Sequence, residues 1–156
     1  LRYSYENTIY SHASVMRRVI DLAEITQVGI RNTCKAEIEF LKKTGHDGII
    51  WAEETFENTQ WQNKVLDRLS DNVYITIDLD AFDPSIMPAV GTPEPGGLLW
   101  YQTLKLLNRV IDEKNVVGFD VVELCPIPGF IAPDFMAAKL VFKILGRIFK
   151  KNNWTG

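Results

Sequence analysis

Three aspartates stand at the end of one apolar run in this chain. Residues 73–97 read VYITIDLDAFDPSIMPAVGTPEPGG and contain Asp78, Asp80 and Asp83. A carboxylate that is buried without a partner is strongly unfavourable, so these acids require a positive charge or abundant water. Side chains at i and i+2 of a strand lie about 7 Å apart on one face, and their oxygens can converge on two cations about 4 Å apart. Hard oxygen ligands favour manganese or magnesium over copper.

The simpler interpretation of Asp78 and Asp80 is that they are solvated at a strand end or cap a following turn. The next loop favours a functional site, because residues 88–97 contain three prolines and three glycines. A rigid loop directly above a strand end can form the wall of a site. Asp83 is followed by Pro84, and we interpret this aspartate as a turn former or helix cap rather than as a metal ligand.

The elements that position these acids alternate between strand-like and helix-like patterns. Strands are expected at 25–31, 47–53, 72–80 and 116–124, and helices at 11–23, 35–45, 58–70, 98–114 and 133–150. In the first helix, Val15, Val19 and Leu22 are spaced to share one face. Alternation without hairpin signals indicates parallel strands with helices on both faces, which is an α/β fold. Ligands of such sheets bind at the carboxyl ends of the strands, where Asp78 and Asp80 are expected.

The composition limits the class of protein further. The 156 residues are 46% hydrophobic, which suits one domain. The formal net charge of -3 is spread over mixed acidic and basic residues, so a nucleic-acid partner is not expected. No apolar run approaches the length of about 20 residues that a membrane span needs, and the N-terminus lacks a signal-peptide pattern, so we expect a cytoplasmic protein. Cys34 and Cys125 do not form a disulfide or zinc pattern.

The aspartate segment closely resembles a signature block of the ureohydrolases, the arginase and agmatinase family. That block reads S-x-D-x-D-x-x-D-P and is followed by P-G-T-G-T-P and a glycine pair, with Thr76 here in place of the usual serine and Ala89 and Val90 in place of Gly-Thr. QVGIR at residues 27–31 resembles the G-I-R strand of the family. VVGFDVVELCP resembles its late D-x-x-E-x-x-P strand, and SHASVMRR resembles the segment after its second metal block. The resemblance covers essentially the whole chain.

The resemblance implies a three-layer α/β/α fold with a mainly parallel sheet that is incomplete at its N-terminal side. Two upstream blocks that supply metal ligands in the family, G-G-D-H-S and D-A-H-x-D, do not occur in these residues, and the chain starts at Leu1. We therefore expect residues 1–156 to be a single C-terminal portion of an arginase-like domain. Family members usually assemble as trimers or hexamers, so a homo-oligomer is expected.

Five side chains receive roles from the resemblance. Asp78 would bridge two manganese ions, and Asp80 would chelate one of them. Glu123 would receive the guanidinium group of the substrate, which matches a carboxylate through two parallel hydrogen bonds. His12 would move protons during turnover, and Thr92 would line the substrate pocket. The simpler alternatives are a salt bridge for Glu123, a cap or surface position for His12 and a turn hydroxyl for Thr92.

The expected activity is manganese-dependent hydrolysis of agmatine to putrescine and urea by a full-length parent. The chain alone is expected to be inactive, because it carries only part of the metal-binding set. Two alternatives remain open. One is another ureohydrolase activity, arginase or guanidinobutyrase, and the other is a domain without catalysis that serves as a scaffold.

Overall fold

The computed structural model describes residues 1–57 and 60–154 of the chain. The strands are β1 (Gln27–Ile30), β2 (Ile49–Trp51), β3 (Asn72–Asp78) and β4 (Asn115–Val122). The α-helices are α1 (Val15–Val19), α2 (Lys35–Thr44), α3 (Glu54–Glu57), α4 (Trp61–Arg68), α5 (Trp100–Glu113) and α6 (Ala132–Lys151). Two 3-10 turns, η1 (His12–Ser14) and η2 (Leu79–Ala81), precede α1 and follow β3. The expected order of strands and helices is confirmed, and α3 is an additional short helix. Of the helix expected at 58–70, α4 covers Trp61–Arg68, and residues 58 and 59 lie outside the described residues.

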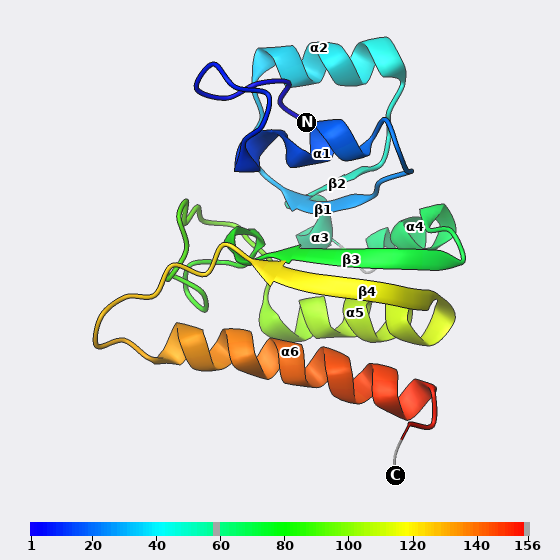
Figure 1. The fold of residues 1–156 in the computed structure, drawn as a ribbon, viewed down its shortest axis with the longest axis vertical. Helices are drawn as coiled ribbons and strands as arrows, with labels where there is room; N and C mark the ends of the chain where they lie inside the picture. Colours follow the sequence, from blue (N-terminus) through cyan, green and yellow to red (C-terminus); the bar gives the residue numbers. More distant parts are fainter. Residues whose placement is uncertain (58–59, 155–156) are drawn as a thin grey trace.

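The strands form two parallel pairs (Figure 1). β1 pairs with β2, and β3 pairs with β4 along its whole length, with Asn72 opposite Asn115 and Asp78 opposite Val122. Within the described residues the two pairs are separate two-stranded sheets and not one continuous sheet. Because all pairing is parallel, the carboxyl ends of β3 and β4 lie side by side, which is where the aspartate segment begins.

Residues on β3 alternate between the core and the exposed face. Val73 and Ile77 are buried and Ile75 is half-buried, whereas Tyr74 and Thr76 are exposed. The period of two is the side-chain period of a pleated strand, so the sequence pattern and the structure agree up to Asp78. The apolar face of β3 packs on helices, and the other face carries polar groups toward the end of the strand.

Helices α5 and α6 pack against β4 and against each other below the strands (Figure 1). The main core joins them to β3 and to the loop after it, through Ile77, Leu79, Phe82, Met87, Val90, Leu104, Leu107, Ile111, Ala137, Leu140 and Ile144. A second cluster joins β2, α4, β3 and α5 through Ile50, Trp61, Val65, Leu66, Val73, Leu106 and Val110. The second cluster therefore packs helices α4 and α5 against strands of both sheets.

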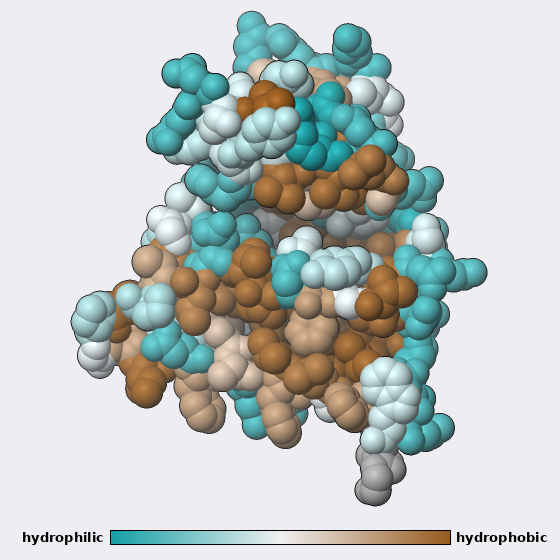
Figure 2. Space-filling view, viewed as in Figure 1, coloured by the Kyte–Doolittle hydropathy of each residue, from teal (hydrophilic) through white to brown (hydrophobic). Residues whose placement is uncertain are grey.

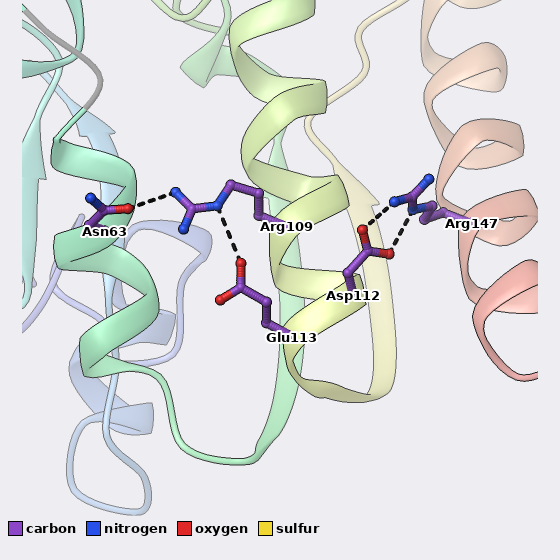
Figure 3. A network of polar contacts seen from close by, with 5 residues as sticks. All are labelled: Asn63, Arg109, Asp112, Glu113 and Arg147. Atoms are coloured by element: carbon purple, nitrogen blue, oxygen red, sulfur yellow. Dashed lines mark hydrogen bonds and ion pairs between the residues drawn. The ribbon is translucent and has the colours of Figure 1, made fainter.

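A side-chain hydrogen bond and an ion pair also connect the helices (Figure 3). Arg109 of α5 donates to Asn63 of α4 at 2.9 Å and to Glu113 at 3.3 Å. Arg147 of α6 forms a two-point ion pair with Asp112 of α5, in which Nε lies 2.7 Å from Oδ1. This pairing holds the pKa of Asp112 below its usual range and raises that of Arg147. Ion pairs this exposed contribute at most about 1 kcal/mol each.

The expected helix at 11–23 is wrong in its extent. The chain forms η1 and then only five residues of α-helix, ending at Val19. Leu22 lies beyond the helix and is 86% exposed, and Val15 is 51% exposed, so these positions do not share a buried face. A helix this short gains little from its own hydrogen bonds, because nucleation is unfavourable. By contrast, α2 ends as expected at Gly45, which adopts a positive φ of 67°.

Apolar side chains gather on the outside of the molecule over β4 and α6 (Figure 2). They include Val117 on β4 and Phe135, Phe142, Leu145 and Phe149 on α6, all well exposed. None of the helices in the described part of the chain is long and apolar enough to cross a membrane.

Candidate functional site

The two predicted metal ligands lie on different elements. β3 ends at Asp78, and Asp80 belongs to the turn η2, so the expectation that both aspartates lie on one strand face is wrong. The strand stops because the backbone N–H of Asp80 donates to Oδ1 of Asp78 at 2.8 Å, which caps the turn. The two residues remain adjacent through this bond. Asp78 therefore caps the turn through Oδ1, and its second oxygen is not used by the cap.

Asp80 carries the clearest sign of a cation site. Its Oδ1 is buried and has no hydrogen-bond partner within the described residues, while its Oδ2 accepts a hydrogen bond from Oγ1 of Thr92. A buried carboxylate oxygen without a donor is costly unless a positive charge approaches it. This oxygen, with the carboxylate of Asp78 beside it, therefore fits a hard divalent cation.

The environment of Asp78 disfavours a lone negative charge. Although the residue is exposed by surface area, atoms around its carboxyl displace water and raise its pKa, and the charges of Asp80 and Glu123 add to that shift. The hydrogen bond from Asp80 and the charge of Arg31 act in the opposite direction. The negative charge of Asp78, which the charges of Asp80 and Glu123 disfavour, becomes more stable when a cation binds beside it.

Glu123 lies next to this pair. It is the first residue after β4, and its neighbour Val122 is opposite Asp78 in the parallel ladder. Its φ is 68°, a value that few residues other than glycine adopt. Such a backbone is less stable by about 1 kcal/mol or more, and this strain is typical of functional positions. The structure therefore brings Asp78, Asp80, Glu123 and, through Asp80, Thr92 together.

The loop after η2 is fixed by one carboxylate. Asp83 accepts hydrogen bonds from the N–H groups of Ser85, Gly96 and Gly97 at 3.0, 2.9 and 3.2 Å. The prediction that Asp83 is a turn former is confirmed. The backbone N–H of Cys125 donates to the carbonyl of Ala89 at 2.8 Å, which joins the loop to the segment after β4. The loop is therefore attached to both strands of the site.

Sequence reasoning missed a polar cluster on the exposed face of the strands. The hydroxyl of Tyr74 donates to Asp120 at 3.0 Å, and that of Thr76 donates to its other oxygen at 2.7 Å. Thr76 lies in the aspartate motif, and Asp120 lies in VVGFDVVELCP. Their residue types alone did not indicate that they form a hydrogen bond, and their positions within these two motifs were the only sequence feature that pointed to them.

A second missed residue is Arg31, which follows β1. Its guanidinium donates to backbone carbonyls of η2 and of the loop, the nearest being that of Asp80 at 2.6 Å. The QVGIR motif contains this residue, and its position directly after a strand was the signal that could have identified it.

His12 lies in η1, and the contact that it makes there is not with the aspartates. Its exposed ring packs edge-on against Tyr5, with ring centroids 5.5 Å apart. In the part of the chain that the structure describes, no hydrogen bond or ion pair joins His12 to Asp78, Asp80 or Glu123. The structure does not bring His12 to the site by any direct contact.

Residues 1–57 and 60–154 contain no group of three or more His, Cys, Asp or Glu side chains that could hold a metal ion. Asp78 and Asp80 alone would therefore form only part of a ligand set. The residues present fit a divalent cation through the free Oδ1 of Asp80, and further ligands have to come from elsewhere.

Comparison with known proteins identifies the family. The arginase family model matches residues 1–146. The N(1)-aminopropylagmatine ureohydrolase of Synechocystis sp. is 39% identical over 148 residues, which are 94% of this chain and 48% of that protein. The agmatinase of Pyrococcus horikoshii is 32% identical over 147 residues, 94% of this chain and 51% of that protein.

Solved structures agree with this result. The agmatine ureohydrolase of Thermoplasma volcanium superposes with a TM-score of 0.87 at 33% identity and covers 100% of this chain and 54% of its own. The proclavaminate amidino hydrolase of Streptomyces clavuligerus gives a TM-score of 0.82 at 26% identity, with 96% of this chain and 53% of that one covered. The chain belongs to the arginase family and has its α/β fold. It spans about half the length of the curated relatives it matches.

Proposed function

We propose that the complete gene product hydrolyses the guanidinium group of a linear amine and releases urea. The observation that carries this proposal is the buried Oδ1 of Asp80, which has no hydrogen-bond partner among residues 1–57 and 60–154 and lies on a family motif beside Asp78 and Glu123. Membership of the arginase family supports the reaction class. Agmatine, which would give putrescine and urea, is the proposed substrate.

The names of the relatives define the substrates to compare. Three relatives at 39% identity are N(1)-aminopropylagmatine ureohydrolases, and one at 32% is an agmatinase. Both substrates carry a guanidinium group on a linear polyamine. N(1)-aminopropylagmatine is therefore the second candidate, and arginine and guanidinobutyrate are the further ones to test.

We assign Asp78 and Asp80 to two manganese ions, together with ligands outside this pair. The ions would supply an activated water molecule and offset the negative charge of the carboxylates. Glu123 would accept two parallel hydrogen bonds from the planar guanidinium and orient its carbon toward the aspartates. Thr92 would fix the orientation of Asp80 through its hydroxyl and line the same pocket.

The reaction balances as one water molecule and one guanidinium giving one amine and one urea. A C–O bond forms at the guanidinium carbon, and the bond from that carbon to the alkyl nitrogen breaks. The leaving nitrogen takes a proton, which we assign to transfer through His12. That assignment requires His12 to reach the site in the complete protein, because its described contacts are with Tyr5.

For the isolated 156-residue chain, we propose weak metal binding and negligible activity, because two carboxylates alone bind a divalent cation weakly. For the complete gene product, we propose a cytoplasmic homo-oligomer, either a trimer or a hexamer. The exposed apolar side chains over β4 and α6 support association.

The test is urea release in the presence of manganese, measured for the complete gene product and for the 156-residue chain. Agmatine, N(1)-aminopropylagmatine, arginine and guanidinobutyrate are compared at equal concentration. We expect the complete product to release one urea per amine from agmatine and to lose activity after treatment with a chelator. The isolated chain is expected to release none.

Two outcomes would contradict the proposal in different ways. If the complete product releases no urea from any of the four compounds, the protein has no ureohydrolase activity on linear guanidinium compounds, and a scaffold role becomes the better account. If the isolated chain turns over agmatine, the assignment of missing ligands is wrong.

A further inference from the structure

One side chain outside the predicted site holds that site together. Arg31, directly after β1, is half-buried and directs its whole guanidinium at backbone carbonyls. Nη2 donates to the carbonyl oxygens of Asp80 at 2.6 Å, Glu94 at 2.8 Å and Phe82 at 3.4 Å. Nε donates to Glu94 at 3.1 Å, and Nη1 donates to Ala81 at 3.5 Å.

These contacts connect three segments that are far apart in the sequence. The acceptors lie on η2 and on the loop near Glu94, about 50 and 63 residues from Arg31. Within the described residues Arg31 forms no ion pair with an acidic side chain. Its N–H donors are directed at backbone carbonyls instead. A planar fork with five donors can satisfy several carbonyls at once, which an ammonium group cannot do in the same geometry.

A neighbouring contact supports the same arrangement. Nδ2 of Asn32 donates to the side chain of Glu94 at 2.8 Å. The end of β1 thus binds both the backbone and the side chain of Glu94. Thr92, two residues earlier, donates to Oδ2 of Asp80. The loop and the turn are therefore fixed relative to each other at the point where Asp80 carries its free oxygen.

We propose that Arg31 is a positioning residue of the metal site. Arg31 holds the backbone carbonyls of Asp80 and Glu94 together. In this way it keeps the hydroxyl of Thr92 hydrogen-bonded to the carboxylate of Asp80, and it orients that carboxylate to bind the cation. Residues that orient a metal ligand without touching the metal typically change metal affinity by about 10–100-fold when they are replaced. The metal part of this inference rests on the proposed function, whereas the effect on the loop does not.

The first test needs no metal. Amide hydrogen exchange is measured on the metal-free complete gene product and on its Arg31→Ala variant. We expect at least tenfold faster exchange at the amides of Asp80, Gly96 and Leu98, because each amide or its acceptor lies in the turn and loop that Arg31 joins. Exchange in the β3–β4 ladder is expected to stay unchanged. Equal exchange of the loop amides in both proteins would overturn the proposal.

The second test measures manganese affinity by titration calorimetry for the same pair and for Arg31→Lys. We expect Arg31→Ala to bind manganese about 10–100-fold more weakly and Arg31→Lys to recover only part of that loss. Arg109→Ala is the matched control, because the hydrogen bonds of Arg109 go to Asn63 of α4 and to Glu113 rather than to the loop, so its loss should lower stability without changing manganese affinity. Unchanged affinity in Arg31→Ala would overturn the role at the metal.

The two proposals can fail separately. If the wild-type protein binds no manganese, the proposed function fails, and hydrogen exchange still decides whether Arg31 holds the loop. If the wild type binds manganese and Arg31→Ala binds it equally well, the positioning role is wrong, whereas full affinity in Arg31→Lys alone would show that the planar fork is not required.

Discussion

The carboxylate of Asp83 joins the two ends of the loop that follows η2. It accepts three backbone N–H groups from two ends of the loop, at Ser85 and at Gly96 and Gly97. The hydrogen bond from the side chain of Ser85, together with these backbone bonds, stabilises the charged form and lowers the pKa of Asp83 to about 2 from 3.8. The folded loop therefore contains Asp83 in its charged form, and protonation of this carboxylate destabilises the loop.

This pKa predicts the direction of a pH effect. A carboxyl group with a lowered folded-state pKa contributes stability above its unfolded pKa of 3.8, and that stability is lost as the pH falls toward about 2. We expect the unfolding temperature of the wild type to fall more steeply between pH 4 and pH 2 than that of Asp83→Asn, measured by circular dichroism. Parallel curves for the two proteins over this range would contradict the assignment.

At the scale of elements, the loop between η2 and α5 folds back closely on itself. A Cβ atom at Gly97 would lie 2.4 Å from the carbonyl carbon of Phe82 and 2.5 Å from the nitrogen of Asp83. Gly91, in the same loop, has open space around the corresponding position. The two glycines therefore offer a matched pair for testing how tightly the loop packs.

We predict that Gly97→Ala lowers the free energy of unfolding by about 3 kcal/mol, because the backbone has to move to accept the methyl group. Gly91→Ala should change it by less than about 0.5 kcal/mol. Chemical denaturation of both variants measures the difference. Equal stability of the two variants would show that the loop is less constrained than its contacts indicate.

The sequence was sufficient to predict most elements, and it failed where tertiary hydrogen bonds decide. The period of two in Val73, Ile75 and Ile77 identifies β3, and Gly45 correctly ends α2. Leu79 continues the apolar period, so the pattern extends the strand to Asp80, whereas the bond from Asp80 to Asp78 ends it two residues earlier. The role of Arg31 depends on partners about 50 residues away, which no local period records.

The candidate site was also predicted only in part, because some of its contacts are tertiary hydrogen bonds. Asp78, Asp80 and Glu123 follow strand ends of a parallel pair, so fold class and position together bring them near one another. The hydrogen bond from Thr92 to Asp80 depends on how the loop folds back. The position of His12 depends on η1 and α1, which have no strong periodic pattern in the sequence. Composition and spacing could not place either of these residues.

At the scale of the whole molecule, the exposed apolar side chains on β4 and α6 predict association. Phe142 of α6 is 65% exposed, and the β4 edge has no strand partner within residues 1–57 and 60–154. Burying exposed aromatic surface against another copy is favourable, and a charge placed there opposes it.

We expect the complete gene product to run as a trimer or hexamer in size-exclusion chromatography with light scattering, and Phe142→Asp to shift its mass toward the monomer. Phe56→Asp is the matched control, because Phe56 on α3 is 54% exposed and lies outside this surface. A monomeric wild type, or a Phe142→Asp variant with unchanged mass, would contradict the assignment of this face.

The most direct test of the account is the rate of urea release from agmatine and N(1)-aminopropylagmatine by the complete gene product and by its Asp80→Asn variant, at saturating manganese. The account predicts manganese-dependent urea release by the wild type and a rate at least about 100-fold lower in Asp80→Asn, because a metal ligand is lost. Asp67→Asn, on an exposed position of α4, should keep the wild-type rate. Urea release by Asp80→Asn at the wild-type rate, or none by the wild type, would contradict it.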